Sequence, residues 1–499
     1  MSMEIAKATH KHRYWLILLC LVLGLGATFL LTQTIPPAQA STPPAPTDLP
    51  ASQRSEAANA SGTYTLYLPF VGLGSWQPPP FGVQFYNTLQ PSQGLTQVTA
   101  AGAIWIRLPV NWENIEPENT TPEYYNWSSI DTPVANAQAE HVQLILTISG
   151  QPPWAADFPM GPLKPDMESE FFEFMSALVE RYDGDGIDDA PGSPWVRYFE
   201  LYNEPDNTDP NTAAEGWGGY WGHNGAGYAA LAQQLYPVVK AANPEAKLIM
   251  GGLALDWFEK DGGPFDQYFL DDVMAACEGN TCFDMANFHY YPVFYTVWAP
   301  YGKGIIGKAT YVRQILAAYG QADMPVICTE MSWASNAVWG NHELQSRYAV
   351  KGFARGMAAD LPIVIWFMVN DAGIEDHYGL LDDTYAPKFS YYAYQTMTDM
   401  LRGATYQRTL TLAETGSNQI EGYVFDVDGQ RLDVIWTNDS TPFNADDDPE
   451  LPFSANASTL WVSDKFGSEV LLDDAYDGVI DGKVTLLVGG SPLFLEYNP

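Results

Sequence analysis

The sequence predicts an α/β protein, with a parallel (β/α)8 barrel followed by a small C-terminal antiparallel β-sandwich domain. Between residues 80 and 403, apolar runs of strand length alternate eight times with amphipathic stretches of helical period. After residue 404 only short alternating runs remain, separated by Asp, Gly, Asn and Pro. The chain has 499 residues, of which 46% are hydrophobic, so it can fill a barrel and a second, smaller core.

Each expected barrel strand is an apolar run rich in β-branched or aromatic residues, as in strands buried on both faces. The eight runs are Phe81–Phe85, Ala103–Pro109, Val142–Ser149, Val196–Leu201, Ala246–Gly251, Asp284–His289, Pro325–Glu330 and Ile363–Met368. The helical stretches between them include Glu168–Tyr182, Ala226–Ala242, Ala309–Tyr319 and Leu344–Ala359. No glycine-rich phosphate loop follows the first run, which disfavours the alternative of an open doubly wound sheet. The sandwich strands are expected at Gln419–Phe425, Arg431–Trp436, Ser458–Val462, Lys483–Leu487 and Leu493–Tyr497.

The first 40 residues have the order of a secretory signal. Three basic residues precede an apolar run from Trp15 to Leu31, and the small residues of Ala38–Ala40 follow. We expect residues 1–40 to be a signal peptide cleaved after Ala40, and hence a secreted, extracellular protein. The apolar run is long, so the alternative is an uncleaved membrane anchor that carries an extracytoplasmic catalytic domain.

Four segments follow the signal in this interpretation. Residues 41–61 are rich in Pro, Ala and Ser and are typical of a linker, and residues 62–79 add a lead-in strand. The barrel spans residues 80–403 and the sandwich spans residues 404–499.

The composition excludes several classes of partner. The chain carries 60 acidic and 23 basic residues, a net charge of −37, which argues against nucleic acid and anionic membrane surfaces. The membrane is a partner only if the N-terminal segment stays uncleaved. Cys277 and Cys282 flank a four-residue loop that could close as a disulfide in an exported protein. Cys328 lies within an apolar run and is expected to be a small buried hydrophobe.

Two glutamates stand at the ends of apolar runs. Glu204 follows the fourth run in the tripeptide Asn203-Glu204-Pro205, and Glu330 ends the seventh run. An ionised carboxylate loses its hydration in such a place, so packing alone does not account for it. Because the carboxyl ends of barrel strands meet at one rim, we expect the two glutamates to form a pair of catalytic carboxylates there.

These residues resemble the catalytic motif of the clan A glycoside hydrolases, which are (β/α)8 retaining enzymes. The resemblance spans residues 80–403 and rests on four strand ends, at Asn203-Glu204-Pro205, Glu330, Arg107 and Trp366. Within the clan, Phe199–Pro205 and Thr329-Glu330, with the trailing β-sandwich, are most similar to family 39, and family 5 is next.

The resemblance implies a different role for each glutamate. Glu204 would be the general acid that protonates the departing glycosidic oxygen, and then the base that activates water. Glu330 would be the nucleophile that forms a covalent glycosyl-enzyme. Such a pair needs carboxyl groups about 5–5.5 Å apart. No cofactor is required for this chemistry.

The resemblance also implies a set of substrate-binding residues around the glutamates. Asn203 would bind the sugar 2-hydroxyl, and Arg107 would keep Glu330 ionised by lowering its pKa. Tyr291 would donate to Glu330, with its neighbour Tyr290 as the alternative, and His289 would contact the substrate or Glu204. For the aromatic platform under the sugar we expect Trp366, and Trp112 is a further candidate whose alternative is core packing.

A second motif is the acidic loop Asp183-Gly-Asp-Gly-Ile-Asp-Asp189. Its carboxylates, Asp183, Asp185, Asp188 and Asp189, could bind a structural Ca²⁺, since this hard cation prefers several oxygen ligands. The alternative is a solvated acidic turn. The loop precedes the fourth strand, at the opposite end of the barrel from the glutamates, so a bound calcium would be structural.

The sequence therefore predicts a secreted retaining glycoside hydrolase whose partner is a carbohydrate. The expected substrates are β-xylosides, β-glucosides or plant-type polysaccharides with β-linkages. Two alternatives are a non-catalytic carbohydrate-binding protein on a hydrolase-like barrel and a transglycosidase.

Overall fold

The computed structural model describes residues 78–216, 218–438 and 448–497. Residues Ser75–Pro499 form one compact unit. The predicted signal segment and linker, and all of the predicted lead-in segment except residues 78–79, lie outside the described residues. Within the described ranges, no helix combines the length and the apolar character that crossing a membrane requires.

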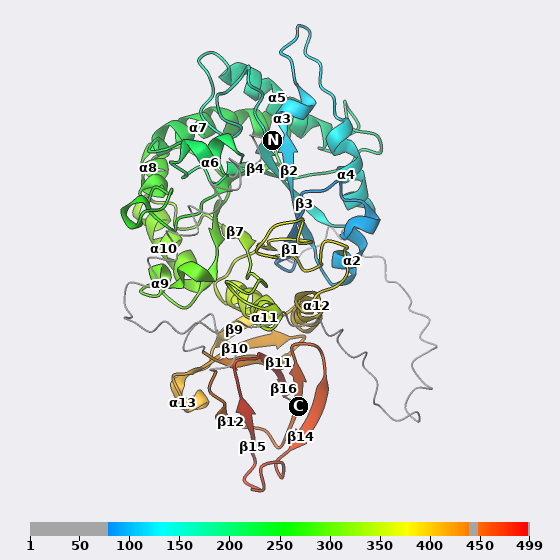
Figure 1. Cartoon of the computed structure of the whole chain (residues 1–499), viewed down its shortest axis with the longest axis vertical. Coiled ribbons are helices and arrows are strands. Elements are labelled where there is room, and N and C mark those ends of the chain that lie inside the picture. The colour runs from blue at the N-terminus through cyan, green and yellow to red at the C-terminus, as the bar shows by residue number, and fades with distance from the viewer. Residues whose placement is uncertain (1–77, 217, 439–447, 498–499) are drawn as a thin grey trace, which may run out of the picture. The chain divides into compact units, whose positions relative to one another are not determined.

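Eight parallel strands form the barrel, as predicted (Figure 1). They are β1 (Phe81–Gln84), β2 (Trp105–Asn111), β3 (Gln143–Ser149), β4 (Tyr198–Asn203), β5 (Lys247–Gly252), β6 (Ala286–Tyr290), β7 (Val326–Met331) and β8 (Val364–Trp366). β1 pairs with both β2 and β8. Parallel bridges from Ile249 to Met285 and from Leu253 to Phe288 join β5 to β6, which closes the ring.

Helices surround the strands on the outside (Figure 1). They are α2 (Leu95–Ala100), α3 (Trp112–Ile115), α4 (Ser128–Ala139), α5 (Glu168–Arg181), α6 (Pro210–Ala214), α7 (Gly225–Ala242), α8 (Phe269–Ala276), α9 (Tyr295–Trp298), α10 (Ile305–Ala318), α11 (His342–Ala358) and α12 (Phe389–Leu401), with 3-10 turns η2 (Pro91–Gln93), η3 (Glu259–Asp261) and η4 (Pro292–Phe294). The side chains of Asn224 and Asn341 cap α7 and α11 by accepting backbone N–H groups of the first turn.

The interior of the barrel is apolar at one end and polar at the other. The N-terminal halves of the strands contribute a buried apolar cluster that includes Trp105, Ile145, Ile249, Ile327 and Ile365. Polar side chains occupy the next inward position along these strands. They include Arg107, Thr147, Glu200, Asn287 and Thr329. Polar side chains therefore line the barrel interior from the middle of the strands to their carboxyl ends, the end at which active sites lie in this fold.

Two antiparallel sheets follow the barrel. The six-stranded sheet contains β9 (Thr405–Thr409), β10 (Ile420–Val427), β11 (Gln430–Thr437), β13 (Thr459–Asp464), β14 (Glu469–Asp473) and β16 (Leu493–Tyr497); β12 (Leu451–Ala455) and β15 (Val484–Val488) form the second, and α13 (Leu412–Thr415) follows β9. A core that includes Val424, Leu460 and Leu486 lies between them. The sequence pattern missed β9, β12 and β14. β9 and β14 are edge strands with mostly exposed side chains, so they lack apolar alternation.

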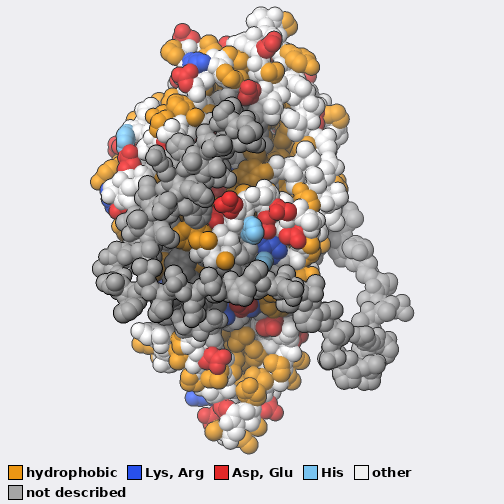
Figure 2. Space-filling model, viewed as in Figure 1, with side chains coloured by type: hydrophobic (Ala, Val, Ile, Leu, Met, Phe, Trp, Pro, Cys, Tyr) orange, Lys and Arg blue, Asp and Glu red, His pale blue; other side chains and the backbone are white. Residues whose placement is uncertain are grey.

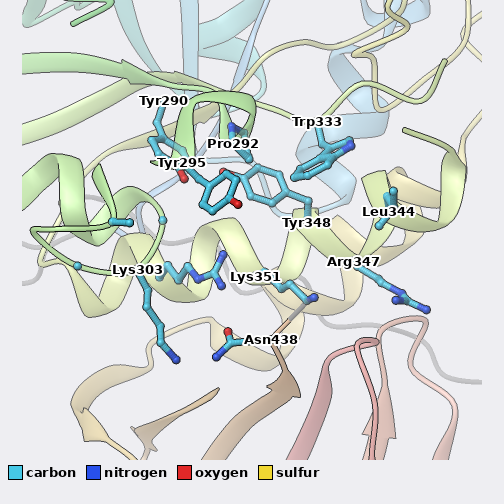
Figure 3. A pocket seen from close by; sticks show the side chains of 14 residues that line it. Tyr290, Pro292, Tyr295, Lys303, Trp333, Leu344, Arg347, Tyr348, Lys351 and Asn438 are labelled. Carbon is cyan, nitrogen blue, oxygen red and sulfur yellow. The ribbon is translucent and has the colours of Figure 1, made fainter. Parts of the chain in front are cut away.

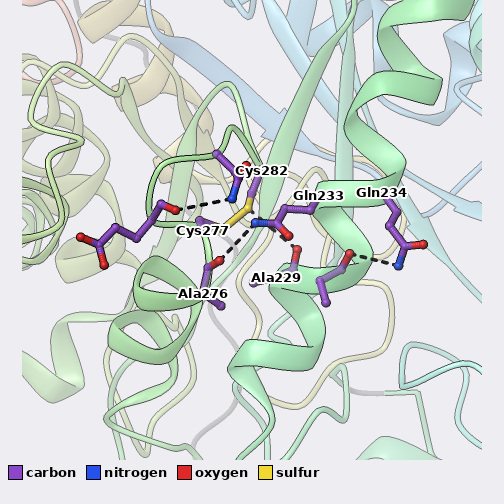
Figure 4. The surroundings of a disulfide bond; sticks show 9 residues. Ala229, Gln233, Gln234, Ala276, Cys277 and Cys282 are labelled. Atoms are coloured by element: carbon purple, nitrogen blue, oxygen red, sulfur yellow. Dashed lines mark hydrogen bonds between the residues drawn. A yellow bond between two sulfur atoms is a disulfide. The ribbon is translucent and has the colours of Figure 1, made fainter.

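A disulfide joins Cys277 and Cys282 after α8 (Figure 4). Beside it, the side chain of Gln233 on α7 donates to the carbonyl of Ala276, which links the two helices. The loop closure that the sequence left open is thus present. Cys328 is free and buried, as predicted.

Candidate active site

The end of β4 breaks the alternation of side chains along the strand. Glu200 points into the barrel, so Tyr202 would be expected to do the same. Instead Tyr202 has a φ of 67° and is buried against Phe171, Trp221 and Tyr228, among the helices. The turn at Tyr202 lets Asn203 point inward.

The end of β7 breaks the alternation in another way. Phe288 on β6 lies opposite Cys328, but the next residue, His289, lies opposite Glu330. Thr329 is therefore an extra residue, as in a β-bulge. Thr329 and Glu330 are consecutive in sequence, yet both reach the polar interior of the barrel.

Glu204 and Glu330 lie on either side of His289. The Nδ1 atom of His289 is 2.9 Å from Oε1 of Glu204 and 3.6 Å from Oε2 of Glu330. One atom from each of the three side chains lies within 4.8 Å of the other two, so the nearest carboxylate oxygens are no further apart than that. The side chain of Glu204 is 18% exposed and that of Glu330 is 6% exposed, so Glu204 is the more accessible to solvent.

Arg107 on β2 connects the nucleophile candidate to its surroundings. Its Nη1 donates to Oε1 of Glu330 at 2.7 Å, and its Nη2 donates to Oδ1 of Asn203 at 2.7 Å. The expected contact between Arg107 and Glu330 is therefore present. Glu204, His289 and Glu330 are close enough to share a metal ion, but the guanidinium of Arg107, 2.7 Å from Glu330, would repel a cation placed there.

Burial raises the pKa of both glutamates, and the net rise is larger for Glu204. For Glu204, burial is reinforced by the negative charges of Glu330, Asp206 and Asp256. For Glu330, burial is opposed by the charge and hydrogen bond of Arg107 and by a tyrosine hydroxyl. As predicted, Arg107 lowers the pKa of Glu330, but burial is the larger effect and the net shift of that pKa is upward. Burial and the neighbouring carboxylates thus favour the protonated form of Glu204, whereas Arg107 and the tyrosine hydroxyl favour the ionised form of Glu330.

Asp206 and Asp256, the two carboxylates that raise the pKa of Glu204 together with Glu330, have hydrogen-bond or ion-pair partners. Asp206 accepts the backbone N–H groups of Ala254 and Leu255, and burial raises the pKa of Asp206 to about 7. Asp256 is paired with the fully buried Lys308 at 3.0 Å. Burial lowers the pKa of His289 well below its usual value, so the imidazole beside Glu204 is neutral.

Of the two adjacent tyrosines, Tyr291 is the one in the site. Its hydroxyl donates to Oε2 of Glu330 at 2.8 Å. Tyr290 points the other way and lines a separate cavity (Figure 3). The backbone is extended at Tyr291, and successive side chains of extended backbone point to opposite sides.

Trp366 does not reach the site, and the prediction that it forms the sugar platform is wrong. Its side chain is fully buried, lies 6.2 Å from the ring of Tyr348 on α11, and donates to the carbonyl of Tyr378. The next residue, Phe367, takes the place expected for Trp366. The ring of Phe367 is partly exposed and lies 6.3 Å from Tyr291 and 6.0 Å from Tyr86.

Trp112 is also a core residue, which contradicts its prediction as a substrate contact. It is fully buried and stacks on Phe174 at 5.2 Å, and its indole N–H donates to Glu116. Its own helix, α3, begins directly after β2, so the ring turns toward α5 and away from the barrel axis.

The acidic loop before β4 folds on itself. Asp183 and Asp185 each accept a backbone N–H two residues on, and Asp189 accepts the N–H of Gly186. Carboxylate oxygens of Glu180, Asp183 and Asp185 lie within 4.8 Å of one another. Asp188 and Asp189 are outside that group, and calcium binding stays a prediction.

A separate cavity of about 260 Å³ lies between the segment after β6, helix α11 and Asn438 (Figure 3). Neither Glu204 nor Glu330 lines it. Two cations on its wall have acidic partners: Arg347 pairs with Glu343, and Lys303 pairs with Glu421. We assign this cavity no part in the reaction.

Figure 2 shows Asp and Glu side chains scattered over one face of the molecule, with few Lys or Arg between them.

A (β/α)8 barrel with carboxylates at the ends of β4 and β7 defines the chain as an O-glycosyl hydrolase of clan A. The chain matches the family described as Cellulase (glycosyl hydrolase family 5) over residues 72–371, more than half of its length. It therefore belongs to this family. No curated protein matches the chain.

Solved structures share the fold. A family 39 glycoside hydrolase from the gut symbiont Bacteroides cellulosilyticus is 21% identical, with a TM-score of 0.62 over 85% of this chain and 81% of that one. A glucosidase from Croceicoccus marinus is 14% identical, with a TM-score of 0.56 over 84% and 95%. A family 39 β-xylosidase from Caulobacter crescentus is 15% identical, with a TM-score of 0.53 over 85% and 98%. The two families expected from the sequence thus recur in the family match and in the fold.

Proposed function

We propose that the protein is a secreted retaining hydrolase of β-linked glycosides that acts by double displacement. The observation that carries this proposal is the spacing of Glu204 and Glu330, whose nearest oxygens lie within 4.8 Å. A retaining pair stands about 5–5.5 Å apart, whereas an inverting pair needs about 6.5–9.5 Å to admit a water. The disulfide between Cys277 and Cys282 supports export, since such bonds persist in oxidising compartments.

In the first step, Glu330 attacks the anomeric carbon while Glu204 gives its proton to the departing oxygen. The structure supports this division because Glu330 holds the contact to Arg107, and Glu204 sits beside a neutral His289. Loss of its proton leaves Glu204 anionic. It can then take a proton from water, which attacks the glycosyl-enzyme and releases Glu330.

Asn203 is suited to the sugar 2-hydroxyl. Its Oδ1 accepts a hydrogen bond from Arg107, so its amide NH2 group is left to donate to a sugar hydroxyl. Phe367, flanked by Tyr291 and Tyr86, is the best-placed aromatic face for the sugar ring. A binding protein would need neither a protonated acid nor a guanidinium-paired carboxylate, so the arrangement favours hydrolysis over binding alone.

For the substrate, we propose a β-xyloside or β-glucoside. The solved structures that share the fold include a β-xylosidase and a glucosidase, which supports this choice. Aryl β-xylosides and β-glucosides should therefore be cleaved, and aryl α-glycosides should not.

The proposal is tested by Glu330→Ala assayed on an activated aryl β-glycoside. We expect kcat to fall on the order of 10⁴-fold or more, because the nucleophile is lost. Added azide should restore turnover and give a glycosyl azide of inverted anomeric configuration, since the small anion fits the vacated space. Activity within a few-fold of the wild type would overturn the assignment.

A further inference from the structure

Glu200 on β4 is a fully buried carboxylate to which the reaction assigns no role. It lies four residues before Glu204, inside the barrel and beneath the two catalytic glutamates. An unpaired charge there would be strongly unfavourable, so the hydrogen-bond partners of Glu200 indicate its role.

Both oxygens of Glu200 are surrounded by donors. Oε2 accepts from Nε of Arg107 at 2.6 Å and from the hydroxyl of Thr147 at 2.5 Å. Oε1 accepts from Nη2 of Arg107 at 3.1 Å, the backbone N–H of Gly252 at 3.0 Å and the amide of Asn287 at 2.7 Å. The hydroxyl of Thr329 is 3.0 Å from the same oxygen. These donors come from five different strands, so Glu200 is a fixed point at the centre of the barrel.

The two bonds from Arg107 form a fork on Glu200. This bidentate geometry fixes the plane of a guanidinium as well as its position. Its remaining N–H groups then point at Oε1 of Glu330, Oδ1 of Asn203 and Oε1 of Gln84. All five N–H donors of Arg107 are thus used, and its only fork is the one on Glu200.

Glu200 also contacts the residue before the nucleophile. Thr329 is the extra residue of the β7 irregularity, and its hydroxyl lies between Glu200 and Asn287. Glu200 therefore reaches Glu330 by two routes: through Arg107 and through the backbone of β7.

We propose that Glu200 is a positioning residue that orients Glu330 and Asn203 by clamping Arg107 and Thr329, and that shares the charge of Arg107 with Glu330. The inference rests on the proposed function, since it gives Glu200 a task in that reaction. Its charge also has a consequence for pH. Glu200 raises the pKa of Glu330 by repulsion, so neutralising Glu200 leaves Arg107 to stabilise ionised Glu330 alone and lowers that pKa.

Two substitutions separate the charge from the clamp. Glu200→Gln removes the charge at constant shape and puts an amide N–H against a donor. We expect kcat to fall about 10²-fold with KM nearly unchanged, because a misplaced nucleophile slows the chemical step. The acid limb of kcat/KM should move about one unit to lower pH. Glu200→Asp keeps the charge but is one methylene too short for the fork, so kcat should fall while the acid limb stays in place.

The matched control is Glu421→Gln. Glu421 is likewise buried and accepts two bonds from an arginine, Arg355, but it lies on β10 and contacts neither catalytic glutamate. It should lower the melting temperature and leave the pH profile unchanged. If Glu200→Gln fails to fold, Thr147→Val removes one donor to Oε2 and should still lower kcat several-fold, whereas unchanged kcat would contradict the clamp.

Different outcomes would overturn the role of Glu200 and the proposed glycosidase function. A wild-type protein without glycosidase activity would sink both. An active wild type with Glu200→Asp at full kcat would overturn the clamp alone. An acid limb of Glu200→Gln that does not move, or that moves to higher pH, would overturn the sharing of charge.

Discussion

The hydroxyl of Tyr291 offers a sharp test of the electrostatics at the nucleophile. It donates to Oε2 of Glu330 at 2.8 Å, and it lowers the pKa of a carboxyl that burial raises. Tyr291→Phe removes this donor and keeps the ring. A hydrogen bond to a charged group contributes about 1.5–3 kcal/mol, which corresponds to a shift of about one to two pKa units.

The direction of the pKa shift depends on which form of Glu330, ionised or protonated, the Tyr291 hydroxyl stabilises. Tyr291 stabilises the ionised nucleophile, so its loss raises the pKa of Glu330. The acid limb of kcat/KM should then move to higher pH, and the variant should lose more activity at pH 5 than at pH 7. The assay is a pH series of kcat/KM on an activated aryl β-glycoside.

The chain supplies a matched control in the adjacent residue. Tyr290→Phe removes the same hydroxyl from the opposite side of the strand, where it lines the separate cavity of Figure 3. Its acid limb should coincide with that of the wild type. Equal shifts in the two variants, or no shift for Tyr291→Phe, would refute the reasoning.

Three further predictions address other parts of the structure. Glu204→Ala should lose about 10²–10⁴-fold in kcat on glycosides with poor leaving groups and much less on activated ones; equal losses would remove its role as acid. Phe367→Ala should raise KM about tenfold, while Trp366→Phe should leave KM near the wild-type value; the reverse result would restore Trp366 as the platform. If the loop at Asp183–Asp189 binds calcium, a chelator should lower the melting temperature and added Ca²⁺ should restore it, and an unchanged melting temperature would contradict that prediction.

The eight barrel strands could be predicted because burial on both faces leaves a continuous apolar run in the sequence. β9 and β14 could not, since an edge strand with mostly exposed side chains carries no such pattern. The two glutamates were visible for a related reason. A carboxylate at the end of an apolar run stands out against its neighbours.

Side-chain direction at the strand ends was harder to predict. Trp366 and Phe367 are adjacent, and only their placement on β8 decides which one faces the sugar. The irregularities at Tyr202 on β4 and Thr329 on β7 likewise change which side chains at those strand ends face the barrel interior, without any mark in the sequence. Trp112 illustrates the same limit, since an aromatic residue after a strand can turn to either side.

Glu200 was overlooked although the sequence contained a signal for it. It lies within Tyr198–Asn203, an otherwise apolar and aromatic strand apart from its last residue. A carboxylate inside a strand buried on both faces must have a charged or hydrogen-bonding partner. That partner, Arg107, lies 93 residues away in sequence, so only the fold could identify it.

The most direct measurement is to trap the glycosyl-enzyme. An activated 2-deoxy-2-fluoro β-glycoside should inactivate the protein with a mass increase of one fluorosugar, because the fluorine slows hydrolysis of the intermediate more than its formation. Peptide mapping should place the sugar on Glu330. A label on another residue, or first-formed products of inverted configuration with ordinary substrates, would contradict the assignment of Glu330 as the nucleophile of a retaining enzyme.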